Sequence, residues 1–507
     1  MSEQLPLPLE GLTKRPSIAG LPKNRRIFVN RNLSMANIDW IGFDMDYTLA
    51  IYDQAEMDRL SIEVTARKLV AERGYPEWIT SIPYDTRFPI RGLLIDKKHG
   101  HVVKMDRYKS VGKAYRGFRP LGKDQVRTLY HATKHRAPTS RYHFIDSLYA
   151  LSEAAVYTGI IDAFDEREIP VDHGKLFTDI RECIDEAHRD GTVFAAITSD
   201  FSRFLVRDPE LAPTLHKLRS AGKKLFLLTN SRRAYTEQVM EYLLGGASAE
   251  YPTWRHYFDI LIVAASKPAF FQEHRPIMER VHEDRPESPL RPAQTMERGR
   301  IYEGGNLHDL ERMLKVPSDR LLYVGDHIYG DILRSKKESA WRTVMIIQEL
   351  DVEVAAHEEC AEALSQHEEL EARRAHLEDE LRYHQSCFKD VQRQIDAATT
   401  RPAAPPKVPA QSPAELELDR TRHKRAVDRV RALLREIEAE SRELEARIDR
   451  TFHPYWGSLL KEGVETSGFG DQVEEYACLY TSRVSNFYYY SPLQSFRSPR
   501  DLMPHEL

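Results

Sequence analysis

The chain has 507 residues, more than one compact core usually holds, so we expect two or three structural units, and its 41% hydrophobic content is enough to bury a sizeable core. A near balance of 73 basic and 78 acidic side chains leaves a net charge of −5, which gives no electrostatic case for nucleic acid or an anionic membrane as the main partner. The four cysteines have no CxxC spacing, which favours the reducing cytoplasm. No apolar run approaches the ~20 residues of a membrane span, and the N-terminus is polar, so we expect a soluble protein.

Short apolar runs separated by helical patterns follow a proline-dotted N-terminus. Residues 1–35 are predicted to form an extended arm, and a first strand follows over Ile38–Phe43. Four later runs have the same short apolar character: Leu225–Leu228, Ile260–Val263, Leu321–Val324 and Val344–Ile347. Helical patterns such as Ala234–Leu244 and His308–Leu314 lie between them. Buried strands that alternate with helices predict an α/β fold with a Rossmann-like parallel sheet, whose ligands bind at the C-terminal ends of the strands.

A long insertion follows the first strand. About 180 residues separate that strand from the one at Leu225, far more than a single crossover needs. Two helical patterns and one hairpin pattern lie within it: Met57–Arg73, Lys175–Asp190 and Gly92–Met105. We therefore predict an inserted α+β cap domain over residues 57–199, above a core made of residues 36–56 and 200–350.

The composition after the core shifts to Glu, Arg, Ala and Leu. Apolar positions recur at alternating steps of three and four residues, first within Leu377–Ile395 and again within Val427–Ile448. These seams predict an antiparallel, coiled-coil-like helical hairpin over residues 351–450 with a proline-rich tip at 399–413, which we interpret as a solvated structural or oligomerisation arm. The aromatic-rich residues 451–507 are predicted to pack on the core or on a neighbouring subunit.

Polar side chains end the first three of these predicted strands. Asp44 and Asp46 place two carboxylates after the first strand, although two such residues alone are more often turn formers. Thr229 and Asn230 end the next strand and enter a helix, where they could donate to an anion or simply cap the helix. Lys267 follows the third strand and precedes a proline; taken alone, it is most simply a solvated charge.

The last of these motifs is the most specific. A strand ends at Gly325-Asp326, and the pair Gly330-Asp331 follows in the next turn of chain. The two glycines let the backbone bend closely around a ligand. Combined with the other three strand ends, carboxylates from two strands can hold one Mg²⁺, while the threonine, amide and lysine bind phosphoryl oxygens. One carboxylate remains to attack phosphorus and another to carry protons. The set as a whole predicts phosphoryl transfer.

These four motifs resemble those of the haloacid dehalogenase superfamily, whose first motif corresponds to Asp44-Met45-Asp46-Tyr47-Thr48. The resemblance implies that Asp44 is the nucleophile and Asp46 the general acid/base. It also implies a phosphatase, because the dehalogenases that name the superfamily lack the second acid. The implied magnesium ligands are the carboxylate of Asp44, the backbone carbonyl of Asp46 and Asp326, with Asp331 supporting the metal shell.

A closer resemblance is to the cytosolic purine 5′-nucleotidases, the branch that prefers IMP and GMP. Four segments carry it: Phe43–Leu49, Gly325–Ile332, Ser335–Lys337 and Ser498–Glu506. The likeness covers roughly Asn30–Leu350 and Phe452–Glu506. Nothing is carried over to the charged hairpin, and the nucleotide effector site known in the family is not carried over either.

The resemblance also implies a purine site on the cap. Arg181, Asp185 and His188 match the cap helix that grips the base, and their spacing at i, i+4 and i+7 places them on one helical face. Incidental charges on an amphipathic face are the alternative. Tyr149 stands where the family has a stacking aromatic, but the eukaryotic Phe-Asn pair is Tyr149-Ala150 here, so the base preference stays open.

We therefore expect Mg²⁺-dependent hydrolysis of purine nucleoside 5′-monophosphates (IMP or GMP) through an aspartyl-phosphate, in a cytoplasmic homo-oligomer that is a dimer or a tetramer. Nucleoside phosphotransferase activity is also open, because a covalent intermediate permits it. One alternative is the same chemistry on another phosphomonoester, such as a sugar phosphate. The other is a scaffold or oligomerisation protein that acts through its helical hairpin.

Overall fold

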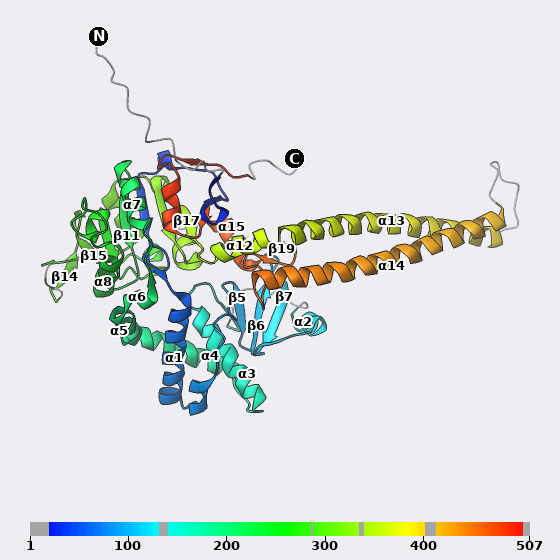
Figure 1. The fold of residues 1–507 in the computed structure, drawn as a ribbon, viewed down its shortest axis with the longest axis horizontal. Helices are drawn as coiled ribbons and strands as arrows, with labels where there is room; N and C mark the ends of the chain where they lie inside the picture. Colours follow the sequence, from blue (N-terminus) through cyan, green and yellow to red (C-terminus); the bar gives the residue numbers. More distant parts are fainter. Residues whose placement is uncertain are drawn as a thin grey trace, which may run out of the picture. The chain divides into compact units, whose positions relative to one another are not determined.

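The structure is a computed structural model that describes residues 20–130, 140–283, 285, 287–333, 339–400 and 412–499 (Figure 1). Most of the predicted N-terminal arm and of the proline-rich tip lie outside these residues, as do Ser335–Lys337 and residues 500–507. The chain forms two compact units, one bounded by Met1–Val354 with Leu459–Leu507 and the other by Ala355–Ser458. This division does not separate a cap from a core, so the predicted domain boundaries stay a prediction.

A ten-stranded sheet forms the centre of the first unit. In spatial order its strands are β1 (Phe28–Val29), β20 (Leu479–Thr481), β17 (Arg342–Ile346), β16 (Leu321–Gly325), β3 (Trp40–Phe43), β11 (Lys224–Leu228), β12 (Ile260–Val263), β15 (Ile301–Gly304), β13 (Ile277–Arg280) and β14 (Leu290–Pro292). The strands from β20 to β15 are parallel, and those at the two edges are antiparallel. The predicted α/β fold with a parallel sheet is confirmed.

Strand β3 lies between β16 and β11, and close packing fixes this arrangement. Gly42 on β3 faces the ring of Phe226 on β11, and a Cβ atom at this position would lie only 2.1 Å from that ring. Phe226 in turn stacks on Tyr323 of β16, with ring centroids 6.3 Å apart. The strands that precede the predicted motifs are therefore direct neighbours. The connecting helices are α7 (Leu211–Ser220), α8 (Arg233–Leu244), α9 (Ala269–Gln272) and α10 (Leu307–Leu314).

The C-terminal segment returns to this sheet. Strand β20 pairs with β17 and with β1, so that residues more than 400 positions apart in the sequence become neighbours. The short helix α15 (Gly468–Tyr476) precedes it. The side chain of Asn30 donates to the carbonyl oxygens of Val473 and Ala477 at 3.0 and 3.2 Å, which ties the beginning of the described chain to the end of α15. The three-residue strand β20 was not predicted, because so short a run has no periodicity of its own.

An inserted α+β region begins and ends at a two-stranded antiparallel pair, β4 (Ile51–Tyr52) with β10 (Leu205–Val206). It contains a five-stranded antiparallel sheet in the order β8 (Arg119–Pro120), β7 (Val111–Arg116), β6 (His101–Met105), β5 (Leu93–Asp96) and β9 (Tyr142–Phe144). Its helices are α1 (Gln54–Arg73), α2 (Lys123–Tyr130), α3 (Leu151–Glu166), α4 (His173–Arg189), α5 (Thr192–Ser199) and α6 (Phe201–Phe204). Helices α1, α3 and α4 pack against one another, which matches the predicted helical patterns and hairpin.

The second unit is a pair of long helices, α13 (Ala361–Thr400) and α14 (Pro413–Phe452), which run side by side in Figure 1. A separate helix, α12 (Leu350–Glu359), precedes them. Contacts between His367 and Glu445 and between Glu380 and Arg429 show that the pair is antiparallel. The buried seam contains Leu370, Leu377, Val430, Ile437 and Leu444. Local heptad spacing thus predicted the helical pairing.

A buried carboxyl group on α1 leads to a test of stability against pH. Asp58 is only 4% exposed, and burial raises its pKa to about 7, although Gln54 donates to it at 2.9 Å. Because the folded pKa lies above the unfolded value, ionisation disfavours the folded state as the pH rises from about 4 to about 7. Asp58→Asn should therefore stabilise the protein at pH 8, by up to about 4 kcal/mol, and much less at pH 5.

Urea unfolding at both pH values measures this difference. Glu63→Gln is the matched control, since Glu63 is exposed on the same helix and its replacement should change stability little at either pH. Equal stability of the Asp58→Asn variant and the parent protein at pH 8 would contradict the raised pKa of Asp58.

Candidate active site

The four predicted motifs lie together at one edge of the central sheet. Asp44 directly follows β3, Thr229 follows β11, Lys267 comes four residues after β12 and Asp326 follows β16. These four strands are parallel and adjacent, in the order β16, β3, β11, β12. Their C-terminal ends therefore meet at one place, as expected for the ligand site of such a sheet.

Lys267 is the centre of the buried charge network. Its Nζ lies 2.9 Å from Oδ1 of Asp44 and 2.7 Å from Oδ1 of Asp331, and it donates to the hydroxyl of Tyr323 at 2.8 Å. Burial lowers the pKa of this lysine, but the two aspartates outweigh the effect and raise it, so the ammonium stays charged. The Asn230 amide donates to the Lys267 carbonyl at 2.9 Å and accepts from its backbone N–H. Asn230 thus positions the lysine, a role that the sequence did not indicate.

Three carboxylates gather beside this lysine. Ligand oxygens of Asp44, Asp326 and Asp331 lie within 4.8 Å of one another. Burial and the charge of Asp331 raise the pKa of Asp326 to about 7, and burial likewise raises the pKa of Asp44. One ammonium cannot balance three adjacent carboxylates, so the cluster has a deficit of positive charge. An oxygen-only donor set with this deficit fits a hard divalent cation such as Mg²⁺.

The loop that holds the last two carboxylates is tightly built. A Cβ atom at Gly325 would lie 2.7 Å from the side chain of Asp331, so no larger residue fits there. Arg91, which is fully buried, donates to the Asp326 carbonyl oxygen at 2.9 Å and forms a bidentate ion pair with Glu349 at 2.7 and 2.6 Å. Sequence inspection missed Arg91, because its partners lie more than 230 residues away.

Hydroxyl groups hold the carboxylate of Asp46 from two sides. Tyr52 on β4 donates to Oδ1 at 2.6 Å, and Ser231 donates to Oδ2 at 2.6 Å. The hydroxyl of Tyr235 lies 2.8 Å from that of Tyr52 and extends this network. Burial raises the pKa of Asp46, whereas the hydrogen bonds from Ser231 and Tyr52 lower it. These opposing effects suit an acid/base catalyst, which has to hold a proton and release it.

A cavity of about 1110 Å³ connects these strand ends with the inserted region. Asp46 and Asn230 line it, and so do all four residues predicted to contact a base: Tyr149, Arg181, Asp185 and His188. The rings of Tyr149 and His188 meet edge to face, with centroids 5.1 Å apart. The three polar residues come from one face of α4, as their spacing predicted. One space therefore joins Asp46 and Asn230 to the predicted base site.

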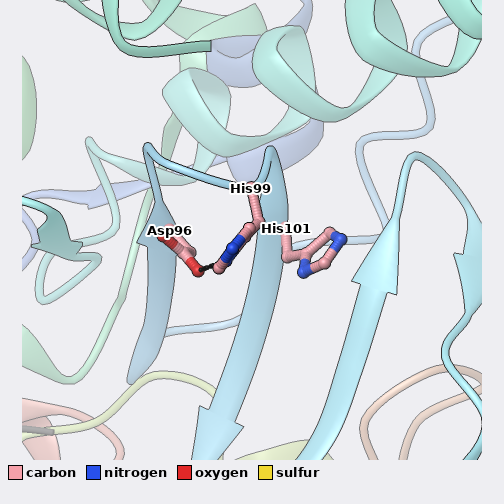
Figure 2. Close-up of side chains that lie close together, drawn as sticks. All are labelled: Asp96, His99 and His101. Atoms are coloured by element: carbon pink, nitrogen blue, oxygen red, sulfur yellow. Dashed lines mark hydrogen bonds and ion pairs between the residues drawn. The ribbon is translucent and has the colours of Figure 1, made fainter. Parts of the chain in front are cut away.

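A second cluster, of Asp96, His99 and His101, lies at the turn between β5 and β6 (Figure 2). The Arg141 guanidinium donates to the two oxygens of Asp96 at 2.8 and 2.6 Å and lies 2.9 Å from Nδ1 of His99. Burial raises the pKa of Asp96, but hydrogen bonds from Arg141, His99 and Tyr130 outweigh it and hold the pKa below its usual value. The guanidinium of Arg141 already pairs with Asp96, so this cluster is a salt-bridged network at the β5–β6 turn.

Among the described residues, no helix combines the length and the apolar character that crossing a bilayer requires.

A sequence model described as the 5′ nucleotidase family matches residues 27–507. A 5′-nucleotidase domain-containing protein of Dictyostelium discoideum is 28% identical over 485 residues, covering 95% of this chain and 74% of that protein. Human 5′-nucleotidase domain-containing protein 2 is 33% identical over 355 residues, covering 67% of this chain and 66% of that protein.

Solved structures give a weaker comparison. The crystal structure described as a predicted phosphoglycolate phosphatase from Haemophilus somnus matches 62% of this chain and 86% of that protein, with 16% sequence identity. Its TM-score of 0.26 is too low to support a structural argument.

Proposed function

Because the chain belongs to the 5′ nucleotidase family, we propose that it hydrolyses purine nucleoside 5′-monophosphates, IMP and GMP, with Mg²⁺ and through an aspartyl-phosphate on Asp44. Family membership confirms the resemblance to 5′-nucleotidases and the expectation of a 5′-nucleotidase enzyme. The observation that carries the finer proposal is the cavity that joins Asp46 and Asn230 to Tyr149 and Arg181.

The proposed reaction begins with the phosphate against the strand ends. Thr229, Asn230 and Lys267 bind its oxygens. Asp44, the Asp46 carbonyl and Asp326, with support from Asp331, would hold Mg²⁺, which would neutralise phosphate charge. Oδ1 of Asp44 accepts from the Met45 backbone N–H at 2.8 Å and contacts Lys267, which leaves Oδ2 as the attacking atom.

Proton transfer falls to Asp46. As Oδ2 of Asp44 bonds to phosphorus and the bond to the 5′-oxygen breaks, Asp46 gives its proton to that oxygen and the nucleoside leaves. Asp46 then accepts a proton from water, whose oxygen attacks the aspartyl-phosphate and releases inorganic phosphate. The hydrogen bonds from Tyr52 and Ser231 keep the carboxyl group of Asp46 oriented through both steps.

A substrate panel tests the proposal and separates it from its alternatives. We expect phosphate release from IMP and GMP, with AMP, pyrimidine monophosphates and sugar phosphates turned over at least about tenfold less efficiently. Release from sugar phosphates alone would keep the chemistry and reject the base site. No release from any phosphomonoester would favour a scaffold that acts through α13 and α14. Inosine added as an acceptor, with new nucleotide as the product, tests phosphotransfer.

The proposal includes a cytoplasmic homo-oligomer, a dimer or a tetramer. The oligomer is supported by the long charged pair α13 and α14, whose buried seam lies between the two helices and whose outer faces are mostly polar. Sedimentation of the full chain gives the subunit number directly.

A further inference from the structure

Glu153 is a buried acid in the wall of the cavity that has no role in the mechanism above. It lies in the first turn of α3 and is 6% exposed. Among the described residues, no donor lies within hydrogen-bond distance of its Oε2. The nearest nitrogens are Nη1 of Arg181 at 3.7 Å and Nε2 of His143 at 3.8 Å. A buried carboxylate oxygen without a donor is unfavourable, and burial raises the pKa of Glu153 to about 7, so a ligand N–H that donates to this oxygen would stabilise the charged form.

The two nearby nitrogens are already engaged with each other. Burial and the charge of Arg181 lower the pKa of His143 to about 4, so its ring is neutral at pH 7 and can accept a hydrogen bond. Nη1 of Arg181 lies 3.0 Å from Nε2 of His143, a distance that fits donation from the guanidinium. Asp185, one turn along α4, lines the same cavity. The same wall thus presents the guanidinium of Arg181 and two acceptors, Glu153 and Asp185.

A base of matching polarity carries a carbonyl oxygen beside a ring N–H. In a 6-oxopurine, O6 accepts from a guanidinium, and the adjacent N1–H donates to a carboxylate. Adenine has the opposite pattern, because its 6-amino group donates and its N1 lone pair would face the carboxylate. A site built around a hydrogen bond rejects the analogue that lacks it far more strongly than an apolar pocket does.

We propose that Glu153 accepts a hydrogen bond from the ring N–H of the base while Arg181 donates to the neighbouring carbonyl, and that Glu153 thereby sets the preference for 6-oxopurine over adenine nucleotides. The inference rests on the proposed function and adds a specificity residue to it. Glu153 is not among the groups placed at the phosphate or at the reacting atoms, so its effect belongs mainly to KM.

Two substitutions in the full chain test the role. Glu153→Gln keeps the shape, but its amide can turn either oxygen or nitrogen toward the base, so it should no longer distinguish the two patterns. Glu153→Met removes the acceptor altogether. For both variants we expect the ratio of kcat/KM for IMP to that for AMP to fall about 10- to 100-fold, mainly through a higher KM for IMP. Glu166→Gln, an exposed position at the end of the same helix, should keep the parent ratio.

The parent enzyme is assayed first with p-nitrophenyl phosphate, IMP, GMP and AMP, and thermal melts show that each variant is folded. If the parent releases phosphate from p-nitrophenyl phosphate but from no 6-oxopurine nucleotide, the proposed function and this inference both fail. A parent that prefers IMP, together with folded variants at position 153 that keep its IMP-to-AMP ratio, would overturn the role of Glu153 alone. A selective fall in that ratio supports it.

Discussion

Asp44→Asn should reduce phosphate release from IMP by at least about 10³-fold while the protein stays folded. An amide cannot attack phosphorus, whereas its oxygen can still accept from the backbone N–H of Met45 and from Lys267. Lys267 keeps Asp331 as a charged partner. Burial already raises the pKa of Asp44, so a neutral side chain should be tolerated without loss of stability.

Two measurements make this result specific to the nucleophile. Phosphate release is compared with that of Asp39→Asn, a control at the opposite end of the same strand, where Asp39 is half-buried and pairs with Arg320. Acid quenching with ³²P-labelled substrate should trap a base-labile phosphoprotein in the parent and none in the Asp44→Asn variant. Substantial turnover by this variant in its folded state would show that another group attacks phosphorus.

Removal of divalent cations should reduce the rate of phosphate release at least about 10²-fold, and added Mg²⁺ should restore the rate. Ligand oxygens of Asp44, Asp326 and Asp331 lie within 4.8 Å of one another, and burial together with the charge of Asp331 raises the pKa of Asp326 to about 7. A bound divalent cation relieves this repulsion and binds only the folded site, so the midpoint of thermal unfolding should also rise with Mg²⁺ concentration.

Asp326→Asn should raise the Mg²⁺ concentration that gives half-maximal activity, because a neutral amide is a poorer ligand than a carboxylate. Asp319→Asn is the matched control, since Asp319 is exposed just before the same strand, β16, and should leave that concentration unchanged. Full activity in EDTA, with no effect of Mg²⁺ on the melting midpoint, would contradict a cation at this cluster.

Several elements could be predicted from the sequence because their signals are local. The strand before Asp44 shows a single apolar run. The helix that carries Arg181 and the heptad seams of α13 and α14 show a repeat within a few turns. The four motifs that follow such strands could also be placed at one edge, because parallel strands direct their C-terminal ends to the same side.

The strand order, which makes β16, β3, β11 and β12 neighbours, was not determined by any local pattern. It depends on contacts such as that between Gly42 and Phe226, which join residues almost 200 positions apart. The same holds for strand β20, whose three residues gain their place only by pairing with β17 and β1.

By itself, the sequence determined which residues could carry phosphoryl chemistry and which segments would be strands or helices, because both follow from side-chain type and short spacing. Only the tertiary structure decided what each group touches. It placed Lys267 between Asp44 and Asp331, Tyr52 against Asp46, and Glu153 without a donor in the cavity wall. These contacts join distant segments, and burial sets their electrostatics, so no pattern within one segment could have specified them.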